Sequence, residues 1–359
     1  MNRYAVCALG IALGLWMSGC GGDETPSAPA PKIAAEGDPF VLYLSPDGAD
    51  SLSGLTPSEA LMTLAGAHMR LRQYKPVIDQ DIEIRIRFVA AKPYLGQTVD
   101  WTHTSPEHTI SFMPEDYRSY GRIDIMAGRP VFDGQGAEDW FFDLRQPEAG
   151  AAGGPTNVRF YYLHIQNYVP GAIRFHGDRD DRSGWNGYNT VSGCCFYRLG
   201  NMHFASDSVG YGALDLVNSD HNVIRNNRFE RLANRGLDGA LCHAVYLAHN
   251  SEYNRISANS FEYVSGDPIR VRDYSNFNAV IGNSFARTGV HAFMSDWYAE
   301  GECRSWENEF RDNAPLSCGY SGRRLPYRWL LFDNYGEGSD CRIFERRMHA
   351  EGNDWLMCP

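Results

Sequence analysis

The chain has 359 residues, of which 43% are hydrophobic, and its formal net charge at pH 7 is −11. This length suffices for one large domain, and the acidic balance argues against a nucleic-acid partner, because the phosphate backbone is itself negative. Beyond the N-terminal segment, no stretch approaches the ~20 consecutive apolar residues of a membrane-spanning helix.

The N-terminal segment is typical of a secretory signal. Arg3 precedes an apolar run that ends at Met17, and Cys20 follows after two small residues. Small residues before a Cys resemble the lipobox of bacterial lipoproteins; the alternative is an ordinary signal peptide with a chance Cys. The resemblance implies that residues 1–19 are removed and that Cys20 is lipidated. It also implies an exported protein that the lipid alone anchors to the cell envelope, in the outer membrane because Gly and not Asp follows Cys20.

Residues 20–39 are rich in Pro, Ala and Gly, which predicts a flexible tether. The remaining chain, 40–359, is then one domain. It opens with an apolar strand, FVLYL (40–44), an Asp/Gly/Ser turn and an amphipathic helix from Ser58. This order resembles the N-terminal cap of secreted β-helix proteins of the pectate-lyase-like superfamily. The resemblance implies a cap over 40–80 whose helix covers the first coil and protects an open sheet edge.

The following segments alternate apolar and polar residues, as strands do. DIEIRIRFVA, at 81–90, is expected to be the first full strand. Early coils are expected to continue through strands at 109–113, 129–133, 140–144 and 158–165. Because the periodicity fades after residue 310, 311–359 is expected to be an irregular C-terminal cap.

One phrase recurs along the middle of the chain. It reads NTVSGCCF at 189–196, NVIRNNRF at 222–229, NRISANSF at 254–261 and NAVIGNSF at 278–285, with a worn copy, ENEF, at 307–310. Successive full copies start 33, 32 and 24 residues apart, and a second short strand lies between them, at 213–217, 244–248 and 268–272. Short strands that return once per coil predict an all-β fold, a single-stranded right-handed parallel β-helix with coils over 81–310.

The repeated Asn is assigned a structural role and no catalytic one. Asn adopts the left-handed backbone conformation more readily than most residues, and its amide can hydrogen-bond to an Asn of the next coil. We therefore expect Asn222, Asn254 and Asn278 to form a ladder at a sharp turn of the coil.

The cysteines that follow Cys20 show no paired C-x-x-C spacing of a zinc site. In an oxidising compartment, bridges between Cys303 and Cys318 and between Cys341 and Cys358 are the predicted pairs. Cys242 is expected to meet Cys194 or Cys195 one coil away, which leaves one odd thiol.

Aligning the coils by their Asn phrases places equivalent positions in columns, with strands ~4.8 Å apart. One outward column is predicted to hold Asp215, Tyr246, Arg270 and Met294, beside an inward column of Leu214, Val245, Ile269 and Phe293. Arg272 shares the outward face of Arg270, and its own column is predicted to hold Val217, Ala248 and Asp296. The turn that enters these strands holds Gly212, His243, Asp267 and His291.

The columns predict a polar patch on this face: His243, Tyr246, Asp267, Arg270, Arg272, Asp273, His291, Asp296 and Trp297. One interpretation is a solvated ladder of ion pairs, which would contribute little to the stability of the fold and would have no binding role. The mixture of side chains favours a binding site instead. Two adjacent, unpaired guanidinium groups suit an incoming carboxylate, and the aromatic faces of Trp297 and Tyr298 suit a sugar ring.

The patch resembles the sites of polysaccharide lyases and uronate epimerases of the same superfamily. Their chemistry needs a cation on the uronate carboxylate, a base for the C5 proton and, for elimination, an acid for the departing O4. No Lys follows residue 92, and Arg is a poor base. Arg270 and Arg272 are therefore expected to bind the carboxylate, and His243 or Tyr246 is expected to act as base and acid. Substrate contacts are expected from Asp273, His291, Asp296 and Trp297.

Two further functions stay open at this stage. A glycoside hydrolase would use two carboxylates on either side of the bond, drawn from Asp267, Asp273 and Asp296. A non-catalytic glycan-binding or structural β-helix would use none. No cofactor is predicted and Ca²⁺ is left as an alternative, because the acidic cluster of the calcium-dependent lyases is not evident and DRDD (178–181) resembles a solvated turn. The expected partner is an acidic polysaccharide, and the protein is expected to be a monomer.

Overall fold

The computed structural model describes residues 37–74, 80–120, 123–332 and 336–354. The predicted signal peptide, Cys20 and Cys358 lie outside the described residues. No helix within these ranges is long and apolar enough to cross a membrane.

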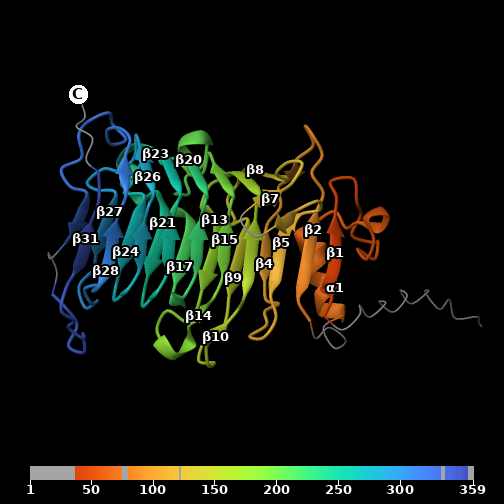
Figure 1. The fold of residues 1–359 in the computed structure, drawn as a ribbon, viewed down its shortest axis with the longest axis horizontal. Coiled ribbons are helices and arrows are strands. Elements are labelled where there is room, and N and C mark those ends of the chain that lie inside the picture. Colours follow the sequence, from red (N-terminus) through yellow and green to blue (C-terminus); the bar gives the residue numbers. More distant parts are fainter. Residues whose placement is uncertain (1–36, 75–79, 121–122, 333–335, 355–359) are drawn as a thin grey trace, which may run out of the picture. The chain divides into compact units, whose positions relative to one another are not determined.

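In the described part of the chain, three long parallel sheets form the body, and the chain visits them in turn, one coil after another (Figure 1). Sheet 1 contains β1 (Phe40–Leu44), β2 (Ile82–Ile86), β5 (Ile110–Pro114), β11 (Val158–Tyr161), β15 (Thr190–Ser192), β19 (Val223–Arg225), β22 (Arg255–Ser257), β25 (Ala279–Ile281), β28 (Asn308–Arg311) and β31 (Met348–Glu351). Sheet 2 contains β3 (Tyr94–Leu95), β8 (Val131–Ala137), β12 (His164–Tyr168), β16 (Cys195–Tyr197), β20 (Arg228–Leu232), β23 (Ser260–Val264), β26 (Ser284–Ala286) and β29 (Ala314–Pro315). Sheet 3 contains β4 (Val99–Trp101), β9 (Phe142–Arg145), β13 (Gly171–His176), β17 (Gly212–Val217), β21 (His243–Ala248), β24 (Ile269–Arg272), β27 (Met294–Trp297) and β30 (Trp329–Leu331).

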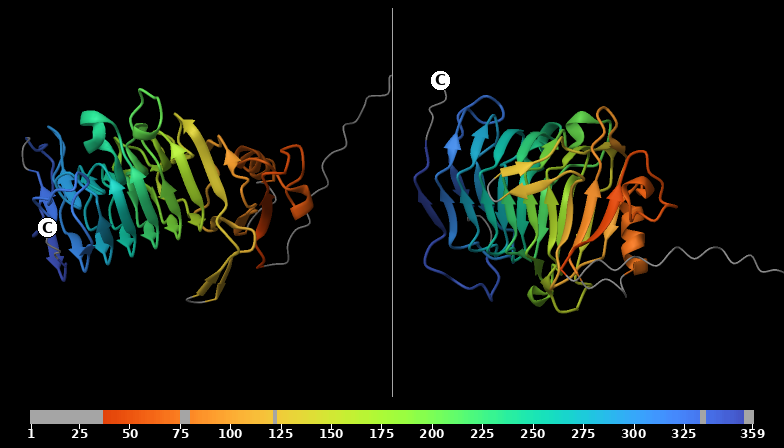
Figure 2. Two further views of the ribbon diagram at one scale, coloured as in Figure 1. Left: turned by 90° about the horizontal axis from the view of Figure 1, so that it is seen from above. Right: turned by 45° about the vertical axis from the view of Figure 1, so that its right-hand side comes forward.

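Each strand of these sheets pairs in parallel with the strand of the next coil, which confirms the predicted parallel β-helix. A small sheet at the turn between sheets 3 and 1 holds β10 (Gly154–Pro155), β14 (Asn186–Gly187) and β18 (Ser219–Asp220). The antiparallel hairpin of β6 (Arg118–Tyr120) and β7 (Ile123–Ile125) projects from the stack (Figure 2). Short 3-10 helices lie at η1 (Pro57–Glu59), η3 (Arg182–Gly184), η4 (Asn201–His203) and η5 (Gly236–Leu241).

The helix α1 (Leu64–Tyr74) lies across the N-terminal end of the stack, as predicted for a cap (Figure 1). It begins later than Ser58, which belongs to η1, because the start of the helix is set by polar contacts at Thr63. The Asp50 carboxylate accepts from the Thr63 amide at 3.0 Å, and the Thr63 hydroxyl accepts from the Gly66 amide at 2.8 Å. Leu64 and Leu71 of the helix are buried against the first coil.

Two segments differ from the sequence-based expectation. Residues 158–165 form two strands, β11 and β12, because Tyr162 between them adopts a left-handed conformation with φ 53° and turns the chain. The segment 311–359 is irregular in its loops, but its short strands β29, β30 and β31 extend all three sheets. The stack therefore continues beyond residue 310.

The Asn ladder forms as predicted. The amide of Asn222 donates to the Oδ1 of Asn254 at 2.8 Å, and the amide of Asn254 donates to Asn278 at 3.0 Å. The left-handed conformation falls on the residue before each ladder Asn, such as Tyr253 (φ 55°), and not on the Asn itself. The turn is made one residue earlier because the ladder Asn must point its side chain into the stack, where it is buried.

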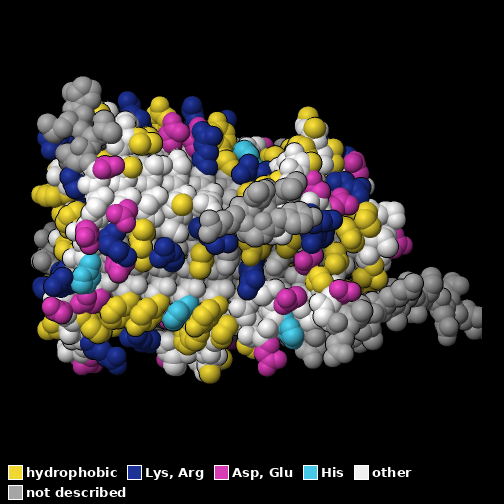
Figure 3. Space-filling model, in the orientation of Figure 1, with side chains coloured by type: hydrophobic (Ala, Val, Ile, Leu, Met, Phe, Trp, Pro, Cys, Tyr) yellow, Lys and Arg dark blue, Asp and Glu magenta, His cyan; other side chains and the backbone are white. Residues whose placement is uncertain are grey.

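Aromatic stacks run along the inside and the outside of the coils. Phe196, Phe229, Phe261 and Phe285, the last residues of the repeated phrases, stack in the core with ring centroids 5.0–5.1 Å apart. Outside, Tyr188, His221, Tyr253 and Phe277 stack at 4.8, 5.0 and 4.9 Å. Figure 3 shows a row of hydrophobic side chains with a histidine among them along the lower edge of the view. At each of these two positions, one chemical character is thus kept over four successive coils.

The predicted disulfide pairs are wrong. Cys303 bonds to Cys341, which places neither in its predicted pair, and Cys318 is disulfide-bonded as well. Cys194, Cys195 and Cys242 are free thiols, so the expected bridge from Cys242 does not form. The prediction was based on spacing along the chain. The paths of the loops in the last coils determine which thiols come close enough in space to form a bond.

Candidate functional site

The outward face of sheet 3 carries the predicted patch. Tyr246 of β21 lies opposite Arg270 of β24, and Val245 lies opposite Ile269. Both aliphatic residues are fully buried in the core, whereas Tyr246 and Arg270 are only partly buried. The predicted neighbours on adjacent coils are therefore confirmed.

The alignment is wrong by one residue in the next coil. Ser295 lies opposite Arg270, Trp297 lies opposite Arg272, and Asp296 lies opposite Val271 on the inward face. The cause is one extra residue between the turn and the strand: two steps lead from Asp267 to the first residue of β24, but three lead from His291 to the first residue of β27.

This shift removes Asp296 from the site. Its side chain is fully buried and pairs with Arg347, whose Nη2 lies 2.8 Å from Oδ2. Burial raises the pKa of Asp296, although Arg347 acts in the opposite direction. The predicted substrate contact from Asp296 is therefore replaced by an internal ion pair.

Arg272 is not a free cation. Its Nε and Nη2 donate to the two carboxylate oxygens of Glu302 at 2.8 and 2.6 Å, in a bidentate pair. Burial by itself lowers the pKa of Arg272, but the contacts with Glu302 and Tyr246 together outweigh burial, so that the pKa is raised. Glu302 lies in the loop after β27, and the sequence offered no signal that it would reach back to β24. The expectation of two unpaired guanidinium groups therefore fails at Arg272.

Arg270 is the unpaired cation of the site. Within the described residues, no carboxylate forms a salt bridge with Arg270, and its Nη1 is buried without a hydrogen-bond partner. Its guanidinium lies 4.9 Å from the ring centroid of Trp297. The guanidinium of Arg272 lies 4.7 Å from the same centroid, so both make cation–π contacts with this ring. Burial lowers the pKa of Arg270, although an Arg stays charged near neutral pH. A buried donor without a partner is costly, so this position favours an anionic ligand.

His243 is held as a neutral imidazole. The ring is buried, and its Nδ1 lies 2.7 Å from the carbonyl oxygen of Asp267. A contact with a carbonyl oxygen requires Nδ1 to donate, which leaves Nε2 as the basic nitrogen. Burial and then the charge of Arg270 lower the pKa of His243 to about 4.

Tyr246 lies beside this imidazole, with ring centroids 5.8 Å apart. Arg272 Nη1 donates to its hydroxyl at 3.4 Å. Burial raises the pKa of Tyr246, against the influence of Arg272, so the hydroxyl keeps its proton at neutral pH. His243 and Tyr246 thus present a proton acceptor and a proton donor on one surface.

A cavity of about 180 Å³ brings these groups together. The residues that line it are Tyr211, Asp215, Leu241, His243, Tyr246, Arg270, Arg272 and Trp297. Asp215 was placed in the outward column but not in the predicted site. Its Oδ2 lies 3.1 Å from His176 Nε2 and 3.7 Å from Arg174 Nε. Burial alone would raise the pKa of Asp215, but His176 and Arg174 lower it.

The remaining predicted residues lie around the cavity and not in its lining. Asp267 is buried, and its Oδ1 accepts from the amides of Val290, His291 and Ala292 at 2.8–3.1 Å. His291 is about half exposed, with its Nδ1 3.6 Å from Asp267 Oδ2. Their contacts support the turn that enters β27.

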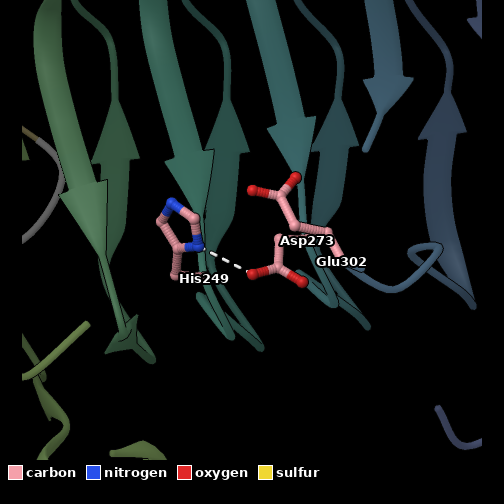
Figure 4. Close-up of side chains that lie close together, drawn as sticks. All are labelled: His249, Asp273 and Glu302. Atoms are coloured by element: carbon pink, nitrogen blue, oxygen red, sulfur yellow. Dashed lines mark hydrogen bonds and ion pairs between the residues drawn. The ribbon is translucent and has the colours of Figure 1, made fainter. Parts of the chain in front are cut away.

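Asp273 belongs to a cluster with His249 and Glu302 at the end of the sheet (Figure 4). His249 Nδ1 donates to Asp273 Oδ2 at 2.7 Å, and the Cys303 amide donates to Asp273 Oδ1 at 3.0 Å. Glu302 is bonded to Arg272, and Asp273 accepts from His249 and the Cys303 amide, so both carboxylates already have partners within the protein. The cluster therefore does not fit Ca²⁺, which prefers six to eight oxygen ligands.

No protein-family model matches this sequence, and no curated protein sequence matches it either. Among solved structures, it is similar to an alginate lyase from Paenibacillus sp. str. FPU-7, with 13% identity and a TM-score of 0.44 over 75% of this chain and 97% of that one. A rhamnogalacturonan lyase has 11% identity and a TM-score of 0.36, covering 87% of each chain. A pectate lyase has 12% identity and a TM-score of 0.30, covering 89% of this chain and 80% of that one. At these values the similarity concerns the fold and does not define the activity of this chain.

Proposed function

We propose that the cavity on sheet 3 binds a uronate unit of an acidic polysaccharide and removes its C5 proton, as a polysaccharide lyase or uronate epimerase does. The observation that carries this proposal is the buried, unpaired Nη1 of Arg270 beside a neutral imidazole and a neutral phenol. An acidic sugar supplies a carboxylate for Arg270, and it also carries the C5 proton and the O4 oxygen on which His243 and Tyr246 would act.

Arg270 binds the carboxylate of the uronate. A guanidinium on that group withdraws charge and makes the adjacent C5–H bond more acidic. Trp297 and Glu302 support this role. Trp297 lies under both guanidinium groups, and Glu302 neutralises Arg272, so that one net positive charge remains for one carboxylate.

His243 Nε2 accepts the C5 proton. In the free protein its pKa of about 4 keeps the imidazole unprotonated and ready at neutral pH. A bound carboxylate neutralises the charge of Arg270, which is one cause of that low pKa, and so makes the imidazole a stronger base.

Tyr246 acts as the acid in the elimination. The C5–H and C4–O4 bonds break, a C4=C5 double bond forms, and the phenol proton goes to the departing O4. The proton held on His243 then returns to the phenolate. In an epimerase a proton from solvent instead adds to C5 on the face opposite His243, His243 releases its proton to solvent, and the chain stays intact.

The alternative function, a glycoside hydrolase with two catalytic carboxylates, is not favoured, because each of the three candidate Asp residues has another role. Asp267 caps a turn, Asp273 pairs with His249 and Asp296 pairs with Arg347. Among the described residues that line the cavity, Asp215 is the single carboxylate, and hydrolysis by the usual route needs two.

The proposal is tested with the purified chain, uronate polymers and neutral polymers. A lyase produces an unsaturated uronate that absorbs in the near ultraviolet, and an epimerase incorporates deuterium at C5 from D₂O without cleavage. New reducing ends without that absorbance, or binding without turnover, would contradict the proposed chemistry.

The residue test is Arg270→Met. We expect affinity for a uronate oligosaccharide to fall about tenfold to hundredfold, since a charge-assisted contact contributes roughly 1.5–3 kcal/mol. The melting temperature should stay constant or rise, because the variant removes an unpaired, partly buried charge. Arg270→Lys should retain part of the affinity, and Arg255→Met, which alters an exposed Arg of β22, serves as the matched control. Equal affinities for Arg270→Met and Arg255→Met would rule out Arg270 as the carboxylate site.

A further inference from the structure

A second, larger cavity lies on the same outward face of sheet 3. It has a volume of about 580 Å³ and lies over β4, β9 and β13. Its charged lining consists of Asp100, Asp139, Asp143, Arg145 and Arg174. The two cavities meet where Arg174 of the larger one contacts Asp215 of the smaller one, at 3.7 Å.

The strand register connects the two cavities. Opposite positions on successive strands run from Asp143 through Arg174, Asp215 and Tyr246 to Arg270. Four inter-strand steps separate Asp143 from Arg270, which is about 19 Å at ~4.8 Å per step. A monosaccharide cannot reach across this distance, but one extended polymer can contact both ends.

The larger cavity offers no unpaired cation of the kind that would bind the carboxylate of a uronate. Arg145 Nε and Arg174 Nη1 donate to the same carboxylate, Asp143, at 3.0 and 2.9 Å. Arg174 also lies 4.5 Å from the ring centroid of Trp140. Both guanidinium groups therefore have an ion-pair partner within the protein, unlike Arg270, although Nε of Arg174 is buried without a hydrogen bond.

Asp100 and Asp139 are the carboxylates of this cavity that form no direct contact with a cation, although Asp100, after Asp143, is one of the carboxylates that raise the pKa of Arg145. Both are exposed, and neither has a hydrogen bond or ion pair to any residue in the described ranges. Three carboxylates and two guanidinium groups give the described lining a formal charge of −1. Carboxylate oxygens accept hydrogen bonds from hydroxyl or ammonium groups and repel another carboxylate.

We infer that the larger cavity is a subsite for a sugar unit without a carboxylate, so that the substrate is a heteropolymer rather than a pure polyuronate. This inference rests on the proposed function: a uronate lies at Arg270, and a neutral or amino sugar of the same chain lies over β4 and β9. The difference in charge between the two cavities then selects the order of sugars along the polymer.

The experiment compares two oligosaccharides of equal length by calorimetry with the full chain. One is a homo-oligouronate, and the other alternates uronate with neutral hexose. We expect the wild-type chain to bind the alternating compound at least about threefold more tightly. In the variant Asp100→Asn/Asp139→Asn, affinity for the homo-oligouronate should rise about threefold to tenfold, while affinity for the alternating compound stays within twofold.

The matched control is Asp340→Asn/Glu345→Gln, which removes two exposed charges from a C-terminal loop and should change neither affinity. Equal binding of both compounds by the wild-type chain, with no response to Asp100→Asn/Asp139→Asn, overturns the subsite and leaves the proposed function standing. Failure of the wild-type chain to bind either compound overturns both.

Discussion

Arg270 and Arg272 lie two residues apart on one face of β24, yet their surroundings differ. Arg272 shares a bidentate pair with Glu302, and the two side chains are only 20% and 13% exposed. Arg270 has no such partner among the described residues. Arg272 therefore has a structural role in its pair with Glu302, whereas Arg270 is the residue proposed to bind the ligand.

This difference predicts the effect of Arg272→Met. The variant leaves a partly buried Glu302 carboxylate that still accepts from the Ala299 amide, at 2.7 Å. We expect the free energy of unfolding to fall by about 1–3 kcal/mol, measured by urea titration. Arg311→Met, which breaks an exposed pair with Glu309, should cost less than about 1 kcal/mol. An equal loss of unfolding free energy in both variants would show that the pair between Arg272 and Glu302 stabilises the fold no more than an exposed ion pair does.

His243 predicts how stability responds to acid. Its pKa is about 4 in the folded state and 6.5 when exposed, so the unfolded chain binds more protons between these values. The stability that His243 contributes is present above pH 6.5 and is lost as the pH falls to 4, in total about 3 kcal/mol. The measurement is the free energy of unfolding against pH, for the wild-type chain and His243→Gln.

The comparison with His243→Gln is needed because Asp220 acts in the opposite direction. Burial raises the pKa of Asp220 to about 7, so its contribution to stability decreases as the pH rises over the same range. Asp220 is present in both proteins, and the difference between their curves isolates His243. Parallel curves between pH 4 and 6.5 would contradict a buried, neutral His243.

At the scale of elements, sheet 3 supplies the site and the Asn ladder keeps its coils in register. The side chain of Asn254 makes four hydrogen bonds at 2.8–3.0 Å: Oδ1 accepts from the backbone and side-chain nitrogens of Asn222, and Nδ2 donates to the carbonyl oxygen of Ser219 and to Oδ1 of Asn278. The ladder is fully buried, so each of these groups depends on its neighbour in the next coil. Such a network is rigid when complete and costly when interrupted.

We therefore expect Asn254→Ala to lower the free energy of unfolding by about 3 kcal/mol or more, because it leaves several buried polar groups without partners. Arg255→Ala changes the next residue, the exposed first residue of β22, and should stay within about 0.5 kcal/mol of the wild type. Denaturant titration of both variants provides the test, and a similar small loss in each would refute a structural role for the ladder.

At the scale of the whole molecule, we propose that Cys20 carries a lipid that tethers the β-helix to the cell envelope. Cys20→Ser should leave the domain folded but move the protein from the membrane fraction to the soluble one, as seen by fractionation and immunoblotting. A parallel Cys242→Ser variant, which removes a buried free thiol, should stay in the membrane fraction. Retention of Cys20→Ser in the membrane fraction would refute lipidation at this residue.

The parallel β-helix fold, and the neighbourhood of Tyr246 and Arg270 on one face of it, could be predicted from the sequence. Alternation of apolar and polar residues selects the buried face of each strand, and the repeated phrase specifies the Asn ladder and the stacked Phe core. These patterns are local and recur at every coil, which is why Tyr246 and Arg270 were predicted as neighbours correctly.

The tertiary structure alone decided which charges are paired. Glu302 reaches Arg272 from a loop, Asp296 turns inward because one extra residue precedes β27, and Cys303 meets Cys341 and not Cys318. The length and path of a loop leave no periodic signal, and an ion pair depends on distance in space rather than on position in the chain. Among the described residues of the site, Arg270 is a cation without an ion-pair partner, and this could not be seen from the sequence because the partners of Arg272 and Asp296 come from distant loops.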